Sequence, residues 1–139
     1  IHFDLKADNI LLDKHYRARL ADFSIAIPCK LGQTDCKTEN MAPQSASPEV
    51  LRQKLQPLRT VDHRTDVYAV GILAFKFAMG CSPFGRSVAA IAVNQLAGKW
   101  DFPRTGVWSS MTPEYRAFVE LCMTQDRDKR PQMEDLKKH

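Results

Sequence analysis

The chain has 139 residues, enough for one domain of ordinary size and too few for two. Hydrophobic residues make up 44% of it and charged residues 26%, a balance that excludes a disordered tail or a fibrous repeat and predicts a packed core. The formal net charge of +4 is spread along the chain without a basic block, so we expect no nucleic-acid partner.

The longest apolar stretch, residues 67–75, is shorter than the roughly 18 to 20 residues that cross a bilayer, so we expect no membrane span. Residues 1–9 do not have the pattern of a signal peptide. The 4 cysteines stand far apart without a metal-ligand spacing, which predicts thiols rather than a zinc site or a disulfide framework. These features leave the compartment open, with the cell interior favoured.

The predicted elements begin with two short strands at residues 10–12 and 18–21, which the polar residues 13–15 join into a hairpin. Residues 28–47 are polar and irregular and predict a long loop, and loops of that length in compact domains are usually functional. Residues 52–63 predict a second irregular stretch, because they are polar and contain a proline.

Helices account for most of the remaining chain. Residues 67–79 are apolar on nearly every side, which predicts a helix buried all round. Thr65 or Asp66 is its expected N-cap, and Gly80 suits its end. A short helix is expected over residues 88–96.

Two further helices are expected toward the C-terminus. Thr112, Pro113 and Glu114 supply an N-cap, a proline in the first turn and an acid near the positive end of the helix dipole, which predicts a helix to about residue 123. The last helix is expected to start near Pro131. The sequence therefore predicts a mostly helical α+β domain with a small β-hairpin and a buried central helix.

Chemistry-bearing side chains flank the predicted hairpin. Asp4, Lys6 and Asn9 precede its first strand, and Asp22 follows its second. Because a hairpin returns the chain to the end from which it started, these groups can converge. Two acids, an amide and a lysine suit phosphoryl transfer from a metal-bound nucleotide, since oxygen ligands hold Mg²⁺ and an acid can orient the attacking hydroxyl.

The motifs along the chain resemble those of protein kinases. In order, they are His2-Phe3-Asp4-Leu5-Lys6-Ala7-Asp8-Asn9 for H-R-D-L-K-x-x-N, Asp22-Phe23-Ser24 for D-F-G, Ser47-Pro48-Glu49 for A-P-E, Asp66-Val67-Tyr68-Ala69-Val70-Gly71 for D-x-W-x-x-G, Cys81-Ser82-Pro83-Phe84 for x-x-P-F, and Asp126-Arg127-Asp128-Lys129-Arg130-Pro131 for D-P-x-x-R-P. Together they cover nearly the whole chain, which is similar to the large C-terminal lobe of a eukaryotic-type protein kinase.

This resemblance implies a role for each residue at the predicted site. Asp4 would accept or orient the proton of the substrate hydroxyl, and Lys6 would neutralise charge on the transferred γ-phosphate of ATP. Asn9 and Asp22 would hold Mg²⁺ on the nucleotide phosphates. Lys6, two residues after Asp4, also resembles the serine/threonine class rather than the tyrosine class.

The resemblance implies structural roles for other motif residues. His2 and Phe23 would belong to a hydrophobic column that continues into the small lobe. Glu49 would pair with Arg130, and Asp66 would accept hydrogen bonds from the backbone of the catalytic loop.

Residues 1–139 would thus form part of a kinase domain, from the catalytic loop to the start of the last helix. The expected partners are ATP, a protein substrate and the small lobe of the same kinase. Without the small lobe, we expect the fragment alone to be inactive.

Three positions depart from the family's pattern. Phe3 replaces the arginine of H-R-D, which would pair with a phosphorylated loop residue. Ser24 replaces the glycine of D-F-G, and Ala42 stands where a threonine usually bonds the catalytic aspartate and lysine. These departures keep open a pseudokinase that acts as a scaffold or regulatory binding module. A small-molecule phosphotransferase of kinase-like fold is a third possibility.

Overall fold

The structure is a computed structural model that describes residues 1–30, 33, 36, 42–55, 61–100 and 106–138. Within these ranges it contains short and longer helices and one two-stranded antiparallel sheet. The elements, in chain order, are η1 (Ala7–Asn9), β1 (Ile10–Leu12), β2 (Ala18–Leu20), α1 (Pro48–Leu55), α2 (Arg64–Met79), α3 (Val88–Ala97), α4 (Val107–Ser110), α5 (Pro113–Cys122), η2 (Arg127–Lys129) and α6 (Met133–Leu136).

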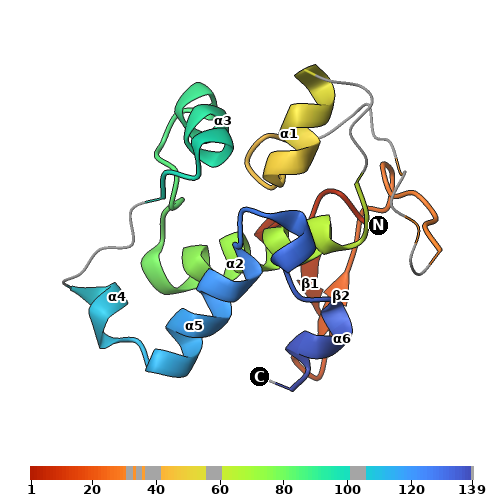
Figure 1. The fold of residues 1–139 in the computed structure, drawn as a ribbon. Helices are drawn as coiled ribbons and strands as arrows, with labels where there is room; N and C mark the ends of the chain where they lie inside the picture. The colour runs from red at the N-terminus through yellow and green to blue at the C-terminus, as the bar shows by residue number, and fades with distance from the viewer. Residues whose placement is uncertain (31–32, 34–35, 37–41, 56–60, 101–105, 139) are drawn as a thin grey trace.

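The central helix α2 organises the fold. In Figure 1 it runs through the middle of the molecule, with α1 and α3 above it and α5 and the hairpin below it. It packs against α5 and α4, while α1 packs against α3. Its buried side chains lie on several faces, as its nearly uniform apolar sequence predicted.

The start of α2 differs from the prediction. The helix begins at Arg64, and the residue at its N-cap position, His63, makes no side-chain capping bond. Asp62 accepts the bond from Arg64 N instead, at 2.9 Å. The carboxylate of Asp66 does not cap the helix and instead accepts hydrogen bonds from His2 N and Phe3 N, before β1. At the other end, Gly80 has the expected left-handed conformation, with a φ of 67°.

A close contact between α2 and α5 requires a glycine. A Cβ atom placed on Gly71 would lie 2.7 Å from Cys122 Cβ and 2.7 Å from Met123 Cγ. The two helices can therefore approach this closely only because position 71 has no side chain.

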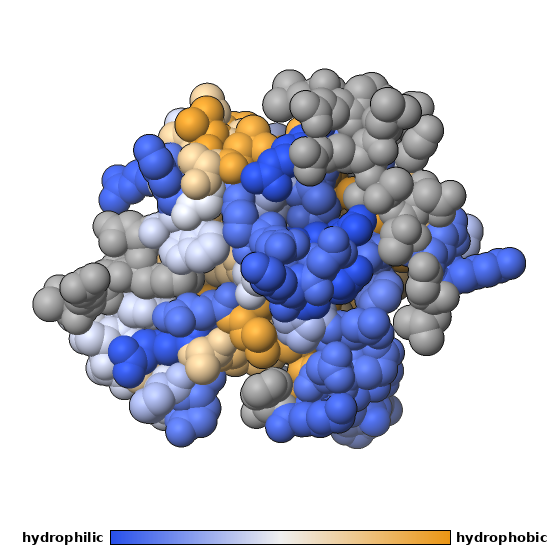
Figure 2. Space-filling view, viewed as in Figure 1, coloured by the Kyte–Doolittle hydropathy of each residue, from blue (hydrophilic) through white to orange (hydrophobic). Residues whose placement is uncertain are grey.

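The main hydrophobic core lies around α2. It is formed by buried residues of α2, the following turn, α3, α4 and the α5 region: Tyr68, Ile72, Phe75, Phe84, Ile91, Trp108, Val119 and Met123. The outer surface in Figure 2 is mostly hydrophilic, with an apolar area over α3, where Val88 and Val93 are exposed.

The structure corrects some predicted boundaries. Residues 52–55, predicted as irregular, are the second half of α1, whose polar side chains hid its helical character. Helix α4 was not predicted, because a helix of 4 residues has too short a pattern to recognise. Helix α6 begins at Met133, after Gln132, which forms a capping box with Asp135. Of the two irregular stretches, residues 31–32, 34–35, 37–41 and 56–60 lie outside the described ranges.

The hairpin forms as predicted, except that β2 ends at Leu20. Ile10 pairs with Leu20, and Leu12 pairs with Ala18. Asp13 shapes the turn, because its Oδ1 accepts hydrogen bonds from the backbone N–H groups of His15 and Arg17. The pairing places the chain before β1 beside the chain after β2, which is where the predicted site residues lie.

Candidate active site

The candidate catalytic carboxylate, Asp4, is 8% exposed. Its Oδ2 atom accepts a hydrogen bond from Lys6 Nζ at 2.6 Å and another from Asn9 Nδ2 at 3.0 Å. Its Oδ1 atom is buried and accepts no hydrogen bond from any residue that the structure describes. One oxygen of Asp4 is therefore fixed by its neighbours, and the other is enclosed by the protein without a donor among the described residues.

The short helix η1 brings Asn9 back to Asp4. Asn9 N donates to Lys6 O at 3.0 Å, and Asn9 Nδ2 also donates to the backbone oxygen of Asp4 at 2.9 Å. The next residue, Ile10, is extended and begins β1. The turn thus places both side chains at one end of the hairpin.

Helix α2 holds the backbone before Asp4. Asp66 Oδ2 accepts a hydrogen bond from His2 N at 2.8 Å, and Asp66 Oδ1 accepts one from Phe3 N at 3.0 Å. Phe3 has a φ of 66°, which is strained for a residue with a Cβ atom. Because both bonds come from one carboxylate on the buried helix, the position of Asp4 is set by α2.

The side chain of Phe3 is part of a second hydrophobic cluster. It is 2% exposed and packs with Cys36, Val50 and Val61. The motif resemblance showed that an arginine is missing at this position but did not predict the burial of the phenylalanine that replaces it. The signal for it was the exchange of a charged residue for a large apolar one.

Asp22 lies beside this arrangement and is exposed. The backbone links it to the site, since Ala21 N donates to Asn9 O at 2.9 Å and Ala21 O lies 3.1 Å from His2 Nε2. Among the described residues, no hydrogen bond joins the Asp22 carboxylate to Asp4 or Asn9 directly. Phe23 stacks at a tilt on His2, with ring centroids 4.8 Å apart.

Ser24 donates two hydrogen bonds to the carboxylate of Asp22 and lowers its pKa. Its hydroxyl donates to Asp22 Oδ1 at 2.6 Å, and its backbone N–H donates to the same atom at 3.3 Å. These bonds, with a smaller contribution from the charge of Lys6, hold the pKa of Asp22 below the ordinary value for an aspartate. An aspartate is already ionised at neutral pH, and these bonds keep the Asp22 carboxylate ionised at lower pH as well.

The pKa of Lys6 is also shifted by its neighbours. Its hydrogen bond to Asp4 raises the pKa of its ammonium group above the ordinary value, and the charges of Asp4, Asp8 and Asp22 act in the same direction. The site thus carries one fixed positive charge among three carboxylates.

A buried ion pair joins the distant motifs. Arg130 Nη1 donates to Glu49 Oε1 at 2.7 Å, and Arg130 Nη2 donates to Glu49 Oε2 at 3.0 Å. The guanidinium also donates to the backbone oxygens of Thr124 and Arg64, and its centre lies 4.8 Å from the centroid of the Tyr68 ring. The pair fastens the start of α1 to η2 and α2, as the resemblance implied.

A comparison with known protein families identifies the family of this chain. A family model described as the protein kinase domain matches residues 1–139. The chain belongs to the protein kinase family. The predicted fold is confirmed with it, since the described helices and the two-stranded sheet fit the C-terminal lobe of a kinase domain.

Several curated relatives of this kinase chain carry the name serine/threonine-protein kinase. A probable serine/threonine-protein kinase of Dictyostelium discoideum is 32% identical over 100% of the chain, which spans 11% of that protein. The kinase pakD of the same organism is 30% identical over 99% of the chain and 8% of its own length. The kinase PEPKR2 of Arabidopsis thaliana is 31% identical over 100% of the chain and 28% of its own length. The chain thus spans a small part of each relative.

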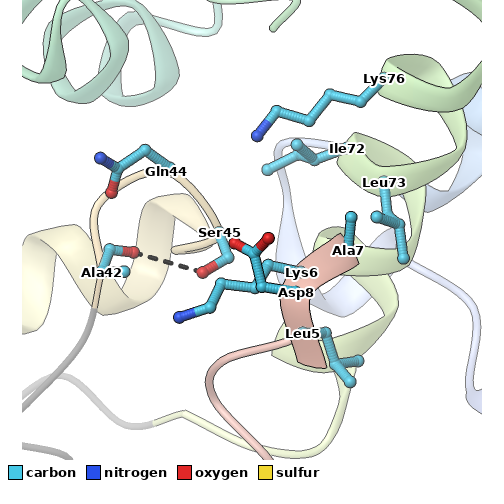
Figure 3. A pocket seen from close by; sticks show the side chains of 10 residues that line it. All are labelled: Leu5, Lys6, Ala7, Asp8, Ala42, Gln44, Ser45, Ile72, Leu73 and Lys76. Atoms are coloured by element: carbon cyan, nitrogen blue, oxygen red, sulfur yellow. Dashed lines mark hydrogen bonds between the residues drawn. The ribbon is translucent and has the colours of Figure 1, made fainter. Parts of the chain in front are cut away.

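A cavity lies next to the catalytic loop of this kinase chain. It has a volume of about 390 Å³ and is lined by residues of the catalytic loop, the segment before α1, and α2: Leu5, Lys6, Ala7, Asp8, Ala42, Gln44, Ser45, Ile72, Leu73 and Lys76. Figure 3 shows Lys76 reaching from α2 toward the segment that carries Gln44, with the Asp8 carboxylate between Lys76 and Lys6 in this view. No described carboxylate lies within ion-pair distance of Lys76.

The donor set of the kinase site fits magnesium and nucleotide phosphates. Asp22 has one carboxylate oxygen that accepts no hydrogen bond from the described residues, and Asn9 adds a carboxamide. No group of three or more His, Cys, Asp or Glu residues in the described ranges is placed to hold a metal ion. A kinase-type site needs none, because phosphates and water complete the coordination of Mg²⁺.

Each helix in the described ranges is too short or too polar to span a bilayer.

Proposed function

We propose that this chain is the large lobe of an ATP-dependent protein serine/threonine kinase. The single observation that supports this most is the state of Asp4, whose Oδ2 is held by Lys6 and Asn9 while its buried Oδ1 has no partner among the described residues. The Asp4 side chain is 12% exposed, so a substrate hydroxyl that reaches this carboxylate can pass it a proton.

In the proposed reaction, the substrate hydroxyl oxygen attacks the γ-phosphorus of ATP and the bond to the β-phosphate oxygen breaks. ADP leaves, and the hydroxyl proton passes to the Asp4 carboxylate. Lys6, whose raised pKa keeps it positive, offsets charge on the transferred phosphoryl group. Mg²⁺, held by Asn9 and Asp22, would supply the remaining charge neutralisation at the phosphates.

We also propose that a small lobe of the same protein completes the site. Large apolar side chains are exposed on the hairpin and just after it, with exposed fractions of 56% at Leu11, 65% at Leu12, 52% at Leu20 and 59% at Phe23. Leu20 and Phe23 lie at the end of the hairpin near Asp4 and Asp22, and Leu11 and Leu12 continue toward the turn. Their exposure supports a covering element and an apolar face for the nucleotide, and it underlies our expectation that the fragment alone does not transfer phosphate.

The protein substrate would use the cavity beside the catalytic loop. Lys6 is neutralised by Asp4, whereas Lys76 and Asp8 each carry an unpaired charge within the described ranges. Lys76 is half-buried and Asp8 is exposed, so solvent screens the negative charge more strongly than the positive one. The less strongly screened positive charge of Lys76 favours an acidic residue of the substrate near the acceptor hydroxyl.

One observation favours the pseudokinase alternative. Asp22 Oδ1 is occupied by the Ser24 hydroxyl, and a D-F-G glycine would make no such bond. If Ser24 keeps Asp22 from reaching the metal, the lobe would serve as a binding module and not as a catalyst.

The deciding experiment measures phosphate transfer from ATP by the complete protein that carries this lobe, with acidic and basic protein substrates and Mg²⁺. We expect transfer by the natural protein and its loss in Asp4→Asn and in Asp22→Asn. Glu134→Gln is the matched control, since it removes an exposed carboxylate on α6. A natural protein that binds partners and transfers no phosphate would support the pseudokinase instead.

A further inference from the structure

Two cysteines that are seven residues apart lie in direct contact. Cys36 Sγ is 2.8 Å from Cys29 Sγ, and all four cysteines of the chain are thiols in the structure. The spacing of the cysteines in the sequence did not predict this contact. The fold brings this pair together because the chain after Asp22 turns back toward α1.

Cys36 has a fixed position. It is 4% exposed and packs in the cluster of Phe3, Val50 and Val61. Cys36 N donates to Val61 O at 3.1 Å, and Gln53 Nε2 donates to Cys36 O at 3.1 Å. This thiol is therefore tied to α1 and to the residue that shortly precedes α2.

Cys29 is the more accessible member of the pair. It is half-buried, and its thiol also lies 3.6 Å from the backbone oxygen of Gln33. It follows the candidate metal ligand Asp22 by seven residues. A small oxidant can reach Cys29 from solvent, and a second thiol is already in place to trap the oxidised product.

We propose that Cys29 and Cys36 are a redox-reactive pair that hydrogen peroxide converts to a disulfide. The Cys29 thiol loses a proton, its thiolate attacks one peroxide oxygen and the O–O bond breaks. The products are a Cys29 sulfenic acid and a hydroxide, which takes up the released proton to form water. The Cys36 thiol then attacks the Cys29 sulfur and displaces a second water. Overall, two thiols are oxidised, one peroxide is reduced, and the two sulfur atoms approach by about 0.8 Å to reach disulfide length.

The other two cysteines provide internal controls. Cys122 is fully buried, and burial raises the pKa of its thiol to about 12, which leaves little thiolate to react. Cys81 is exposed, and no second thiol of the chain is in contact with it. Peroxide could therefore oxidise Cys81 without linking it to another cysteine of the same molecule.

A Cys29–Cys36 disulfide would have a structural consequence at the candidate active site. It would fasten the segment that leads away from Asp22 to α1, whose first turn contains Glu49. The disulfide would thus link the segment after Asp22 to the part of the chain that packs against α1. Helix α1 carries Glu49, which pairs with Arg130. The proposal concerns thiol chemistry and holds whether or not the lobe transfers phosphate.

The test treats the complete protein, reduced and natively folded, with hydrogen peroxide, blocks remaining thiols with an alkylating reagent, and maps peptides under non-reducing conditions. We expect a linked peptide pair containing Cys29 and Cys36 that a dithiol reductant separates. Cys29→Ser should abolish the link, and Cys81→Ser should leave it unchanged. Because Cys29 is half-buried, its serine variant is the one expected to fold normally.

Other outcomes would overturn the proposal. These are full alkylation of Cys29 after a peroxide dose that oxidises Cys81, conversion of Cys29 to a sulfinic acid without a link, or a link from Cys29 to Cys81. Each would show that the two sulfur atoms in contact do not react with one another.

Discussion

Replacing Arg130 by methionine removes the guanidinium from a buried ion pair, and we expect a large loss of stability. The Arg130 side chain is 0% exposed and the Glu49 side chain 8%, so the substitution leaves a buried carboxylate without its partner. Breaking such a pair from one side costs about 3–5 kcal/mol. The backbone oxygens of Thr124 and Arg64 also lose a donor, at about 1 kcal/mol each.

We therefore expect Arg130→Met to reduce the free energy of unfolding by about 4 kcal/mol or more, a large part of the stability of an ordinary domain. Denaturant unfolding of the natural protein and the variant measures this difference. The matched control is Arg17→Met, which breaks an exposed pair with Asp13 where the arginine side chain is 63% exposed. That change should cost about 1 kcal/mol or less.

Two further variants keep this prediction testable if Arg130→Met does not fold. Arg130→Lys keeps the charge and loses the two-point geometry, so its cost should fall between those of the other variants. Replacing Glu49 and Arg130 together by methionine removes the stranded carboxylate and should restore much of the lost stability. The reasoning is refuted if Arg130→Met is no more destabilised than Arg17→Met.

The remaining predictions concern packing, specificity and pH. Gly71→Ala should lower the free energy of unfolding by about 1–3 kcal/mol, measured by denaturation, because its Cβ would meet Met123 Cγ at 2.7 Å; an unchanged stability would contradict the packing described. Lys76→Glu should reverse the preference from acidic toward basic peptides in a phosphorylation assay, whereas equal preferences in both proteins would remove the cavity from substrate recognition. Ser24→Gly should raise the pKa of Asp22 toward its ordinary value, because the hydroxyl bond that favours the carboxylate is lost. Metal binding needs the ionised form and is lost as pH falls through that pKa, so the loss should occur at higher pH in the variant; titration of Mg²⁺ affinity against pH checks this, and identical profiles would count against the role of Ser24.

The parts of the fold that the sequence predicted are those with strong local patterns. The run of apolar residues in α2, the proline and threonine that begin α5, and the polar turn between the two short strands are all patterns of neighbouring residues. The hairpin predicted that Asp4, Asn9 and Asp22 come to one end of the two strands. In the structure Asp4 is hydrogen-bonded to Lys6 and Asn9, whereas no hydrogen bond among the described residues joins the Asp22 carboxylate to them.

The features that were missed depend on contacts between distant segments. The apolar side chain at position 3 signals burial, but the sequence does not show that its partners are Val50 and Val61. Likewise, the contact between Cys29 and Cys36 depends on the path of the chain between them and on the pairing of Cys36 with Val61. Local patterns do not encode these long-range contacts.

The proposal that Asp4 acts in the chemical step can be tested most directly with one rate. The rate of γ-phosphoryl transfer at saturating ATP should be measured for the complete protein and for Asp4→Asn, with nucleotide affinity measured alongside. We predict that the rate falls about 10²–10⁴-fold while nucleotide affinity changes little, because asparagine keeps the shape of Asp4 and cannot accept the proton. Transfer at the natural rate by Asp4→Asn would contradict the proposed role of Asp4.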